Sequence, residues 1–359
     1  MANILDIRRR IRSVKNTRQI TKAMKMVAAA KLRRAQDRAL SSRPYAQMLT
    51  NVLKSLVERA EVVDPETGQP RHPLLAQREE KKILLIVVTG DKGLAGAFNT
   101  NLLKATMKFL DSKRDTNIDI EAVGRKGRDF LRRRFPVVAR QRDEDEDFTR
   151  HEAPAERKGP VQIVGEHIGI LGKVDFADAQ KLGETVIERY TDEEVDAVYV
   201  IYNEFKSVIA QRLVVEQVLP IEKIGERGAV RQAEEFTAEE RARAKEAAVS
   251  AGVGMRPPDT REVDRVAAEF ATQPVDYIYE QSPAELFRSL LPKYVSVQIY
   301  RALLESFAAE NAARMTAMEA ATNNASDMID SLTLLMNRVR QAKITKEIIE
   351  IVSGAAAQE

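Results

Sequence analysis

Residues 318–339 read MEAATNNASDMIDSLTLLMNRV, and their apolar or small side chains recur at alternating intervals of three and four positions. This spacing is the a/d seam of a heptad repeat, so it predicts a helix that lies lengthwise against a partner helix. No proline or glycine occurs between residues 307 and 352, and we expect one continuous helix over that range. The predicted seam consists of Met318, Ala321, Ala325, Met328, Leu332, Leu335 and Val339.

The matching partner helix is expected near the start of the chain, over residues 2–57. Apolar residues keep one heptad phase from Ile4 to Val14, after which a shifted phase is predicted. The shifted phase would consist of Ile20, Met24, Val27, Ala28, Leu32 and Ala35. Pro44 lacks a backbone N–H, so we expect a kink or break there. If it is continuous, this helix would be about 80 Å long at 1.5 Å per residue, which exceeds an ordinary globular domain.

Charge is abundant and unevenly distributed. Charged residues make up 31% of the chain and aromatic residues 5%, a mixture typical of long-helix proteins. The net charge is only +3, yet the first forty residues are strongly basic. Such a helix favours an acidic surface, which nucleic acid, anionic lipid or an acidic protein face could provide. Its cations surround the helix and lack interleaved aromatic or base-reading residues, so an acidic protein face is the sharper alternative to a merely solvated helix.

Several kinds of chemistry lack the residues that they need. The chain has no cysteine, which excludes disulfides, thiol catalysis and thiolate metal sites. Its three histidines, His72, His151 and His167, lie in predicted loops without metal-ligand spacing, so we expect no metal, cofactor or catalytic site. The longest apolar run, Ile83–Val88, is too short to cross a bilayer, and the first residues are too polar for a signal peptide. We expect a cytoplasmic protein, or one held at a membrane by a partner.

The middle of the chain alternates strand and helix patterns. This alternation predicts a small Rossmann-like α/β domain with a largely parallel sheet, carried by a long antiparallel coiled coil of the N- and C-terminal helices. The predicted strands are 82–89, 118–123, 195–202 and 207–218, and the predicted helices are 99–110, 126–134 and 174–190.

Two stretches resemble insertions. Residues 141–160 carry an acidic run with prolines and are predicted to form a solvated loop. Residues 221–275 hold a short charged helix, opened by a capping box of Thr237 and Glu240. Pro292 is a candidate division of the last helical region. The predicted domains are 1–60, 61–220, 221–275 and 276–359.

The turn Gly90-Asp-Lys-Gly-Leu-Ala-Gly96 follows a predicted strand and precedes a predicted helix, which is the setting of a phosphate-binding loop. It matches neither dinucleotide nor Walker spacing, and Lys92 is misplaced for a terminal phosphate. A tight strand-to-helix turn is therefore the simpler interpretation. A nucleotide-binding α/β protein with helical arms stays open as an alternative.

Two long motifs point to a family. Residues 20–36, ITKAMKMVAAAKLRRAQ, and 344–357, ITKEIIEIVSGAAA, resemble the N- and C-terminal signatures of the gamma subunit of rotary F-type ATP synthases. The similarity extends through residues 90–99 and 310–324 and covers nearly the whole chain except the two insertions.

The resemblance implies a central-stalk protein. Its terminal helices would lie inside a ring of alpha and beta subunits, and its α/β domain would contact epsilon and the membrane c-ring. It would be a non-catalytic subunit that couples proton flow to ATP synthesis, peripheral on the cytoplasmic side of a bacterial plasma membrane, without nucleic acid and without inserting into the bilayer.

The resemblance also assigns contact positions. Tyr277 and Glu280 correspond to the segment at the base, facing the c-ring and epsilon, while Lys346 departs from the Gln common at its position. Because the second insertion ends just before Tyr277, its helix is expected at the base, where it could regulate hydrolysis or be merely decorative. Positions facing the alpha and beta subunits would be Met24, Lys31, Arg33, Arg34, Arg340, Gln341, Thr345 and Glu350.

Overall fold

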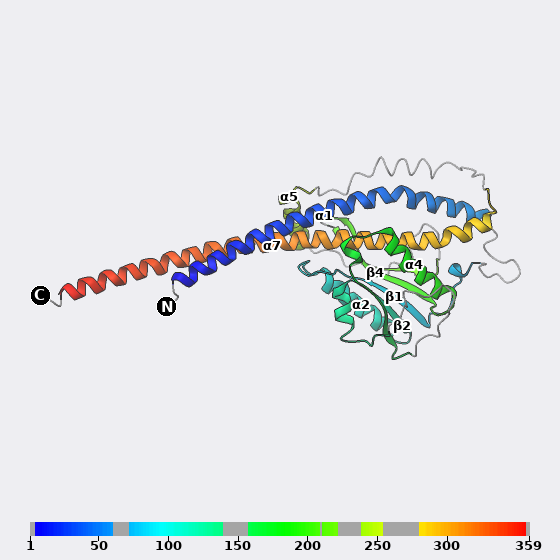
Figure 1. The fold of residues 1–359 in the computed structure, drawn as a ribbon, viewed down its shortest axis with the longest axis horizontal. Helices are drawn as coiled ribbons and strands as arrows, with labels where there is room; N and C mark the ends of the chain where they lie inside the picture. The colour runs from blue at the N-terminus through cyan, green and yellow to red at the C-terminus, as the bar shows by residue number, and fades with distance from the viewer. Residues whose placement is uncertain are drawn as a thin grey trace, which may run out of the picture.

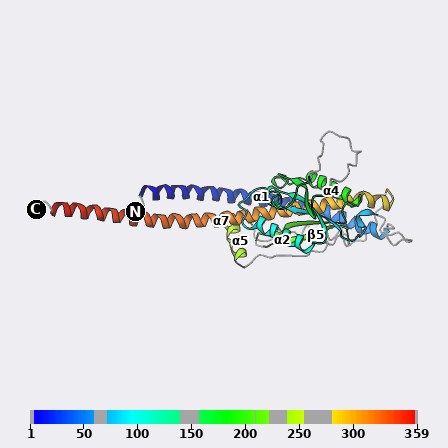
Figure 2. The same ribbon diagram turned by 90° about the horizontal axis from the view of Figure 1, so that it is seen from below.

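The computed structural model describes residues 4–59, 72–138, 157–208, 210–221, 238–253 and 280–356. Two long helices dominate it: α1, Ile4–Arg59, and α7, Pro283–Ala356. They lie side by side and run in opposite directions, and a small α/β domain packs on the part of the pair far from the chain ends (Figure 1). We call the pair of α1 and α7 the shaft. Seen from below, the shaft protrudes from the domain and α7 reaches beyond α1 (Figure 2).

Helix α1 keeps a single heptad phase along its whole length. Buried or half-buried residues recur with steps of three and four from Ile4 to Leu56, without the predicted shift. Ile20 and Val27, which the shifted phase placed inside, are exposed, while Thr21 and Lys25 are buried. The prediction was wrong because polar residues occupy seam positions in this stretch, which interrupts the apolar pattern but not the packing.

Neither internal proline breaks its helix. Pro44 lies inside α1 and Pro292 inside α7, and both helices continue through them. Packing next to each proline explains the continuity, since Leu49 and Leu53 follow Pro44, and Leu291 precedes Pro292, as fully or almost fully buried residues. The cost of a lost backbone hydrogen bond is therefore offset by burial along the rest of the helix.

Within the described residues, the sheet has five strands in the order β3-β2-β1-β4-β5. The first four are mutually parallel and β5 is antiparallel to β4, so the prediction of a largely parallel sheet is confirmed. Strand β3 had not been predicted, because its Gln, Gly, Glu and His weaken the apolar pattern. The strands are β1 Lys82–Val88, β2 Asn117–Val123, β3 Val161–His167, β4 Ala197–Ser207 and β5 Ala210–Leu219.

Helices cover both faces of the sheet. Successive residues of β1 alternate between two cores, so Leu84 and Ile86 join a core with the shaft while Ile83 and Leu85 join a core on the opposite face. The shaft-side core includes α4, and the opposite core includes α2 and the end of α3. Consequently α7 is a structural element of the domain as well as half of the shaft. These helices are α2 Phe98–Ser112, α3 Arg125–Leu131 and α4 Phe176–Thr191, and a short 3-10 turn, η1, spans Pro73–Leu75.

One further helix, α5, spans Ala238–Ser250 within the second predicted insertion. It was expected at the base of the molecule. Instead it packs against the shaft at the other side of the domain, where the helix pair emerges from it (Figure 1). None of the described helices is long and apolar enough to cross a lipid bilayer.

Candidate partner-binding surface of the shaft

Some of the predicted seam residues of α7 face α1 as expected, and others do not. Met318 and Ala325 are buried and Leu332 and Val339 are half-buried, as the heptad requires. The alternate positions are displaced by one residue, since Met328 is 54% exposed whereas Ile329 is 8% exposed. In the same way Leu335 is exposed whereas Met336 is half-buried. Ala321 and Thr322 are both half-buried, so neither alone occupies the seam position. Apolar residues occupy both neighbouring positions in two of these pairs, so spacing alone could not choose between them.

The seam ends at Val339, and α7 continues alone. Every described side chain from Arg340 to Ile351 is exposed, because α1 begins only at Ile4 and does not reach this far (Figure 1). The single helix nevertheless carries an apolar stripe at helical spacing. The stripe consists of Ile344, Ile348 and Ile351, the last being 72% exposed. We call residues 340–356 the projecting segment.

Polar residues fill the rest of the projecting segment. Arg340, Gln341, Thr345 and Glu350, the predicted contacts to alpha and beta subunits, are all exposed there. Two ion pairs follow the helix surface, Lys343–Glu347 at 3.6 Å and Lys346–Glu350 at 3.4 Å. Both pairs are solvent-exposed, so they support the helix only weakly.

The predicted contact residues of α1 have different environments. Met24 and Lys31 are half-buried, and Arg34 is exposed. Arg33 donates a hydrogen bond to the carbonyl oxygen of Gly252, directly after α5. At the base, Glu280 is exposed, while Tyr277 lies outside the described residues. The structure does not bring the α1 and α7 contact positions together, because they lie at different heights along the shaft (Figure 1).

A polar layer crosses the shaft where the domain ends. Lys25 Nζ lies 2.6 Å from Glu319 Oε2, and these side chains are only 7% and 10% exposed. The Thr21 and Thr322 hydroxyls share a hydrogen bond of 2.8 Å next to them. Lys25 is one of the basic residues of the first forty positions, which the sequence alone predicted to face solvent or an acidic partner. The sequence did hold a sign of this layer. Thr21 and Lys25 occupy heptad positions of α1, and the carboxylate of Glu319 lies next to a seam residue of α7.

A second ionic contact ties the shaft to the sheet. Arg301 of α7 donates to Glu216 of β5 at 2.7 Å, and Tyr202 of β4 donates to the same carboxylate at 2.7 Å. Burial, together with the neighbouring Glu305 and Glu216 carboxylates, raises the pKa of Tyr202 well above its ordinary range. The phenol therefore stays protonated and remains a donor. Sequence analysis missed this cluster, because its members lie far apart in the chain.

Glu310 of α7 closes the glycine turn after β1. A Cβ on Gly90 would clash with the Glu310 carboxylate, so any larger residue there would force the Glu310 side chain to move. Arg314, one helical turn along, donates to the Glu310 carboxylate. Burial raises the pKa of Glu310 above its ordinary value, and the pairing with Arg314 only partly opposes this. The turn was predicted to be a tight strand-to-helix connection, and in the structure the small Gly90 leaves room for the Glu310 side chain of α7.

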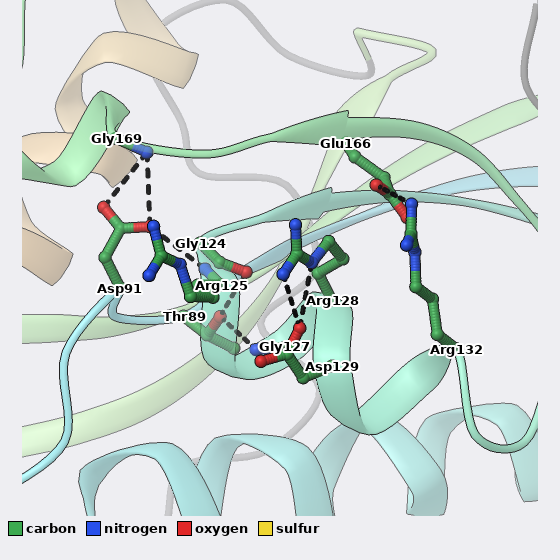
Figure 3. Close-up of polar contacts among 10 residues, drawn as sticks. All are labelled: Thr89, Asp91, Gly124, Arg125, Gly127, Arg128, Asp129, Arg132, Glu166 and Gly169. Atoms are coloured by element: carbon green, nitrogen blue, oxygen red, sulfur yellow. Dashed lines mark hydrogen bonds and ion pairs between the residues drawn. The ribbon is translucent and has the colours of Figure 1, made fainter.

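The carboxyl ends of the parallel strands are where α/β folds usually bind ligands. Here Asp91 occupies this place, accepting hydrogen bonds from the backbone N–H of Arg125 at 3.0 Å and of Gly169 at 3.1 Å (Figure 3). Gly124 lies in the turn after β2, where a Cβ would lie 1.9 Å from the Thr89 carbonyl oxygen. The backbone of Thr89 therefore occupies the space next to this turn. The donors that a phosphate would need are thus already used by the chain's own carboxylate, which weighs against the nucleotide-binding alternative.

The described residues include no group of three or more His, Asp or Glu side chains arranged to hold a metal ion. His72 accepts from the Leu74 N–H at the start of η1, and its ring meets Phe287 edge-on at 6.0 Å. His167 lies 2.9 Å from Glu121 at the end of β3. Both histidines therefore have structural partners, and His151 lies outside the described residues.

Comparison with known proteins identifies the family. A family model described as ATP synthase matches residues 3–358. The ATP synthase gamma chain of Solibacter usitatus is 47% identical, with 100% of each chain covered. That of Anaeromyxobacter sp. is 42% identical, with 99% of each chain covered.

Solved structures agree at the level of the fold. A chain of the Euglena gracilis mitochondrial ATP synthase, in a structure of OSCP, F1 and c-ring, aligns with a TM-score of 0.51 at 19% identity, covering 99% of this chain and 94% of that one. The match to residues 3–358 and the full-length relatives decide the assignment. The chain belongs to the ATP synthase gamma chain family.

Proposed function

We propose that this chain is the central rotor shaft of an F-type ATP synthase. In this role it couples proton flow through a membrane c-ring to the conformational cycle of alpha and beta subunits, and it carries no catalytic site of its own. Its relatives bear the name ATP synthase gamma chain, and the similar Euglena structure contains F1 and a c-ring.

The observation that carries the proposal is the projecting segment. A lone helix with exposed Ile344, Ile348 and Ile351 would fray in water unless another molecule covers it. Its neighbours Arg340, Gln341, Thr345 and Glu350 supply polar contacts around the same helix. A sleeve of alpha and beta subunits that encloses this segment would satisfy both kinds of side chain.

The basic surface of α1 fits an acidic sleeve further down the shaft. Exposed Lys and Arg residues surround the helix, and Met24, Lys31, Arg33 and Arg34 are the positions at which we propose contact. The exposed cations of its first forty residues include Arg8, Arg9, Arg10, Arg12, Lys15, Lys22, Arg33 and Arg34. Charge complementarity would steer assembly and penalise wrong orientations.

Coupling follows if the shaft contacts each catalytic site differently. Each 1.4 kcal/mol of difference in contact energy between two conformations of a site is worth about tenfold in nucleotide affinity. The shaft is asymmetric about its long axis, because one side is formed by α1 and the other by α7, whose sequences differ. Rotation would present these different surfaces to each beta subunit in turn.

The opposite end of the molecule is proposed to face epsilon and the c-ring. Glu280 is exposed just before α7 begins, and Tyr277 is proposed to lie in the same contact. The domain would thus receive torque at its base, and the core shared by the sheet and α7 would pass it to the shaft. The complex would place this subunit at the cytoplasmic face of a bacterial plasma membrane.

Co-expression with alpha and beta subunits tests the proposal. The chain has no cysteine, so Thr345→Cys provides a single thiol in the projecting segment. Paired with a cysteine placed in the facing alpha or beta subunit, this thiol should form a disulfide on oxidation that stops ATP hydrolysis, with recovery after reduction. Gln77→Cys, an exposed position beside η1 at the base, should give no such crosslink. Full turnover with a verified Thr345→Cys crosslink would argue against rotation of the projecting segment relative to the subunits around it.

A further inference from the structure

Helix α5 packs closely against both helices of the shaft. One face of it consists of alanines that are almost completely buried in the core shared with α1 and α7, and the residues that follow continue this face. Small side chains let the helix backbones approach closely and leave little room for sliding. The buried residues are Ala244, Ala247, Ala248, Ala251 and Val253.

Polar contacts fix α5 at one height. Ser250 Oγ accepts from Lys25 Nζ at 2.9 Å, so α5 meets the polar layer of the shaft directly. Asn323 Nδ2 of α7 donates to Glu246 Oε1 at 3.0 Å, and Arg33 donates to the Gly252 carbonyl oxygen. These contacts reach α1 and α7 together, so α5 binds the pair and not one helix alone.

The polar layer and α5 depend on each other. An ion pair taken out of water is stable only if further hydrogen bonds satisfy its remaining donors and acceptors. Lys25 has two partners here, Glu319 and Ser250, and the second belongs to α5. Removing α5 would expose its alanine face and the charged layer at once.

We propose that α5 is a permanent third helix of the shaft, which makes the shaft one-sided at the height of Lys25 and Glu319 and closes that side to the surrounding subunits. The inference rests on the proposed function, because it concerns which shaft surface the alpha and beta subunits can reach. Arg33 then also has a partner within this chain, the Gly252 carbonyl oxygen, which holds its side chain on the α5 side of the shaft. The outward face of α5 replaces that surface with exposed Arg241, Arg243, Lys245 and Val249.

A disulfide that fixes α5 to α7 tests this directly. Glu246→Cys with Asn323→Cys places one thiol on each helix beside the observed hydrogen bond, in a chain without other cysteines. Because Cys is shorter than either native side chain, a short bifunctional thiosulfonate reagent is used to join the two thiols through a reducible disulfide bridge. We expect the disulfide to form in the purified subunit and in the complex with alpha and beta subunits, and to leave ATP hydrolysis unchanged. A loss or gain of turnover that reduction reverses would show that α5 must leave the shaft, and absence of the disulfide would show that it is not docked. Either result overturns the inference.

A second variant separates docking from the effect of the cysteines. Ala247→Asp puts a charge at a fully buried position and should abolish the disulfide, whereas Ala242→Asp, on the exposed side of α5, should leave its yield unchanged. Equal yields in both variants would contradict the docked face. If the chain fails to join alpha and beta subunits, the proposed function fails, while disulfide formation in the purified subunit still decides whether α5 is docked.

Discussion

The two halves of α7 carry similar apolar patterns, but one half is buried and the other is exposed to solvent. Up to Val339 the pattern is buried against α1, with Met318, Ala325 and Ile329 all nearly inaccessible. From Arg340 onward a comparable isoleucine stripe is exposed to solvent. The comparison shows that apolar periodicity reports the need for a partner but does not say whether the partner belongs to the same chain.

The largest effect is expected at the polar layer of the paired half. Glu319→Ala removes the partner of a Lys25 side chain that is 7% exposed, so an unpaired charge stays buried. We expect a loss of about 3–5 kcal/mol in the free energy of unfolding, measured by denaturant titration. A loss below that of an exposed ion pair would contradict the burial of this layer.

Shortening an apolar side chain should destabilise the isolated chain in the paired half but not in the projecting half. Leu32→Ala removes a fully buried side chain on α1 and should cost about 2–5 kcal/mol in the isolated chain. Ile348→Ala, in the projecting segment, should leave the stability of the isolated chain unchanged, since its side chain is exposed. In the assembled complex Ile348→Ala should weaken attachment to alpha and beta subunits, as measured by dissociation. Equal destabilisation of the isolated chain by both variants would break the comparison.

Stability should also depend on pH through Glu310 in the paired half. Burial raises the pKa of this carboxyl above its ordinary value of 4.5, so the folded state holds the proton more tightly than the unfolded state. The contribution is fully present below the unfolded pKa and is lost as pH rises through the raised folded pKa. Glu310→Gln should remove this fall from the stability curve, as chemical denaturation at several pH values can check. An unchanged pH dependence would count against the buried position of the carboxyl.

The smallest effect is expected from the ion pairs of the projecting segment. Glu347→Ala breaks the pair with Lys343, in which both side chains are more than half exposed. The helix content of the isolated chain, followed by circular dichroism, should change little, since such a pair contributes about 0.2–0.5 kcal/mol. If Glu347→Ala lowered the free energy of unfolding as much as Glu319→Ala, the projecting segment would have to be packed against another part of the isolated chain.

Much of the architecture could be predicted from the sequence because it rests on periodicity. The heptads of α1 and α7 and the apolar strands β1, β2 and β4 follow directly from side-chain spacing. Strand β3 was missed, since its mixed composition hides the alternation. Ile20 and Val27 were placed inside α1, because sequence alone could not show that Thr21 and Lys25 find polar partners on α7.

The candidate surface was predictable only where it is continuous along the chain. The projecting segment follows from the point at which the heptad ends, near Val339. The contacts of Arg33 with Gly252 and of Lys25 with Ser250 join residues more than two hundred positions apart, so no local pattern reveals them. For the same reason α5 was recognised as a helix but assigned to the wrong end of the molecule.

The labelling rate of a thiol at the tip of the shaft tests the central claim most directly. Ser353→Cys introduces the only cysteine into the exposed end of α7. Reaction with a maleimide should be fast in the isolated chain and strongly slowed in the complex with alpha and beta subunits, while Gln77→Cys at the base reacts equally fast in both. Equally fast labelling of Ser353→Cys in the assembled complex would contradict the enclosure of the projecting segment.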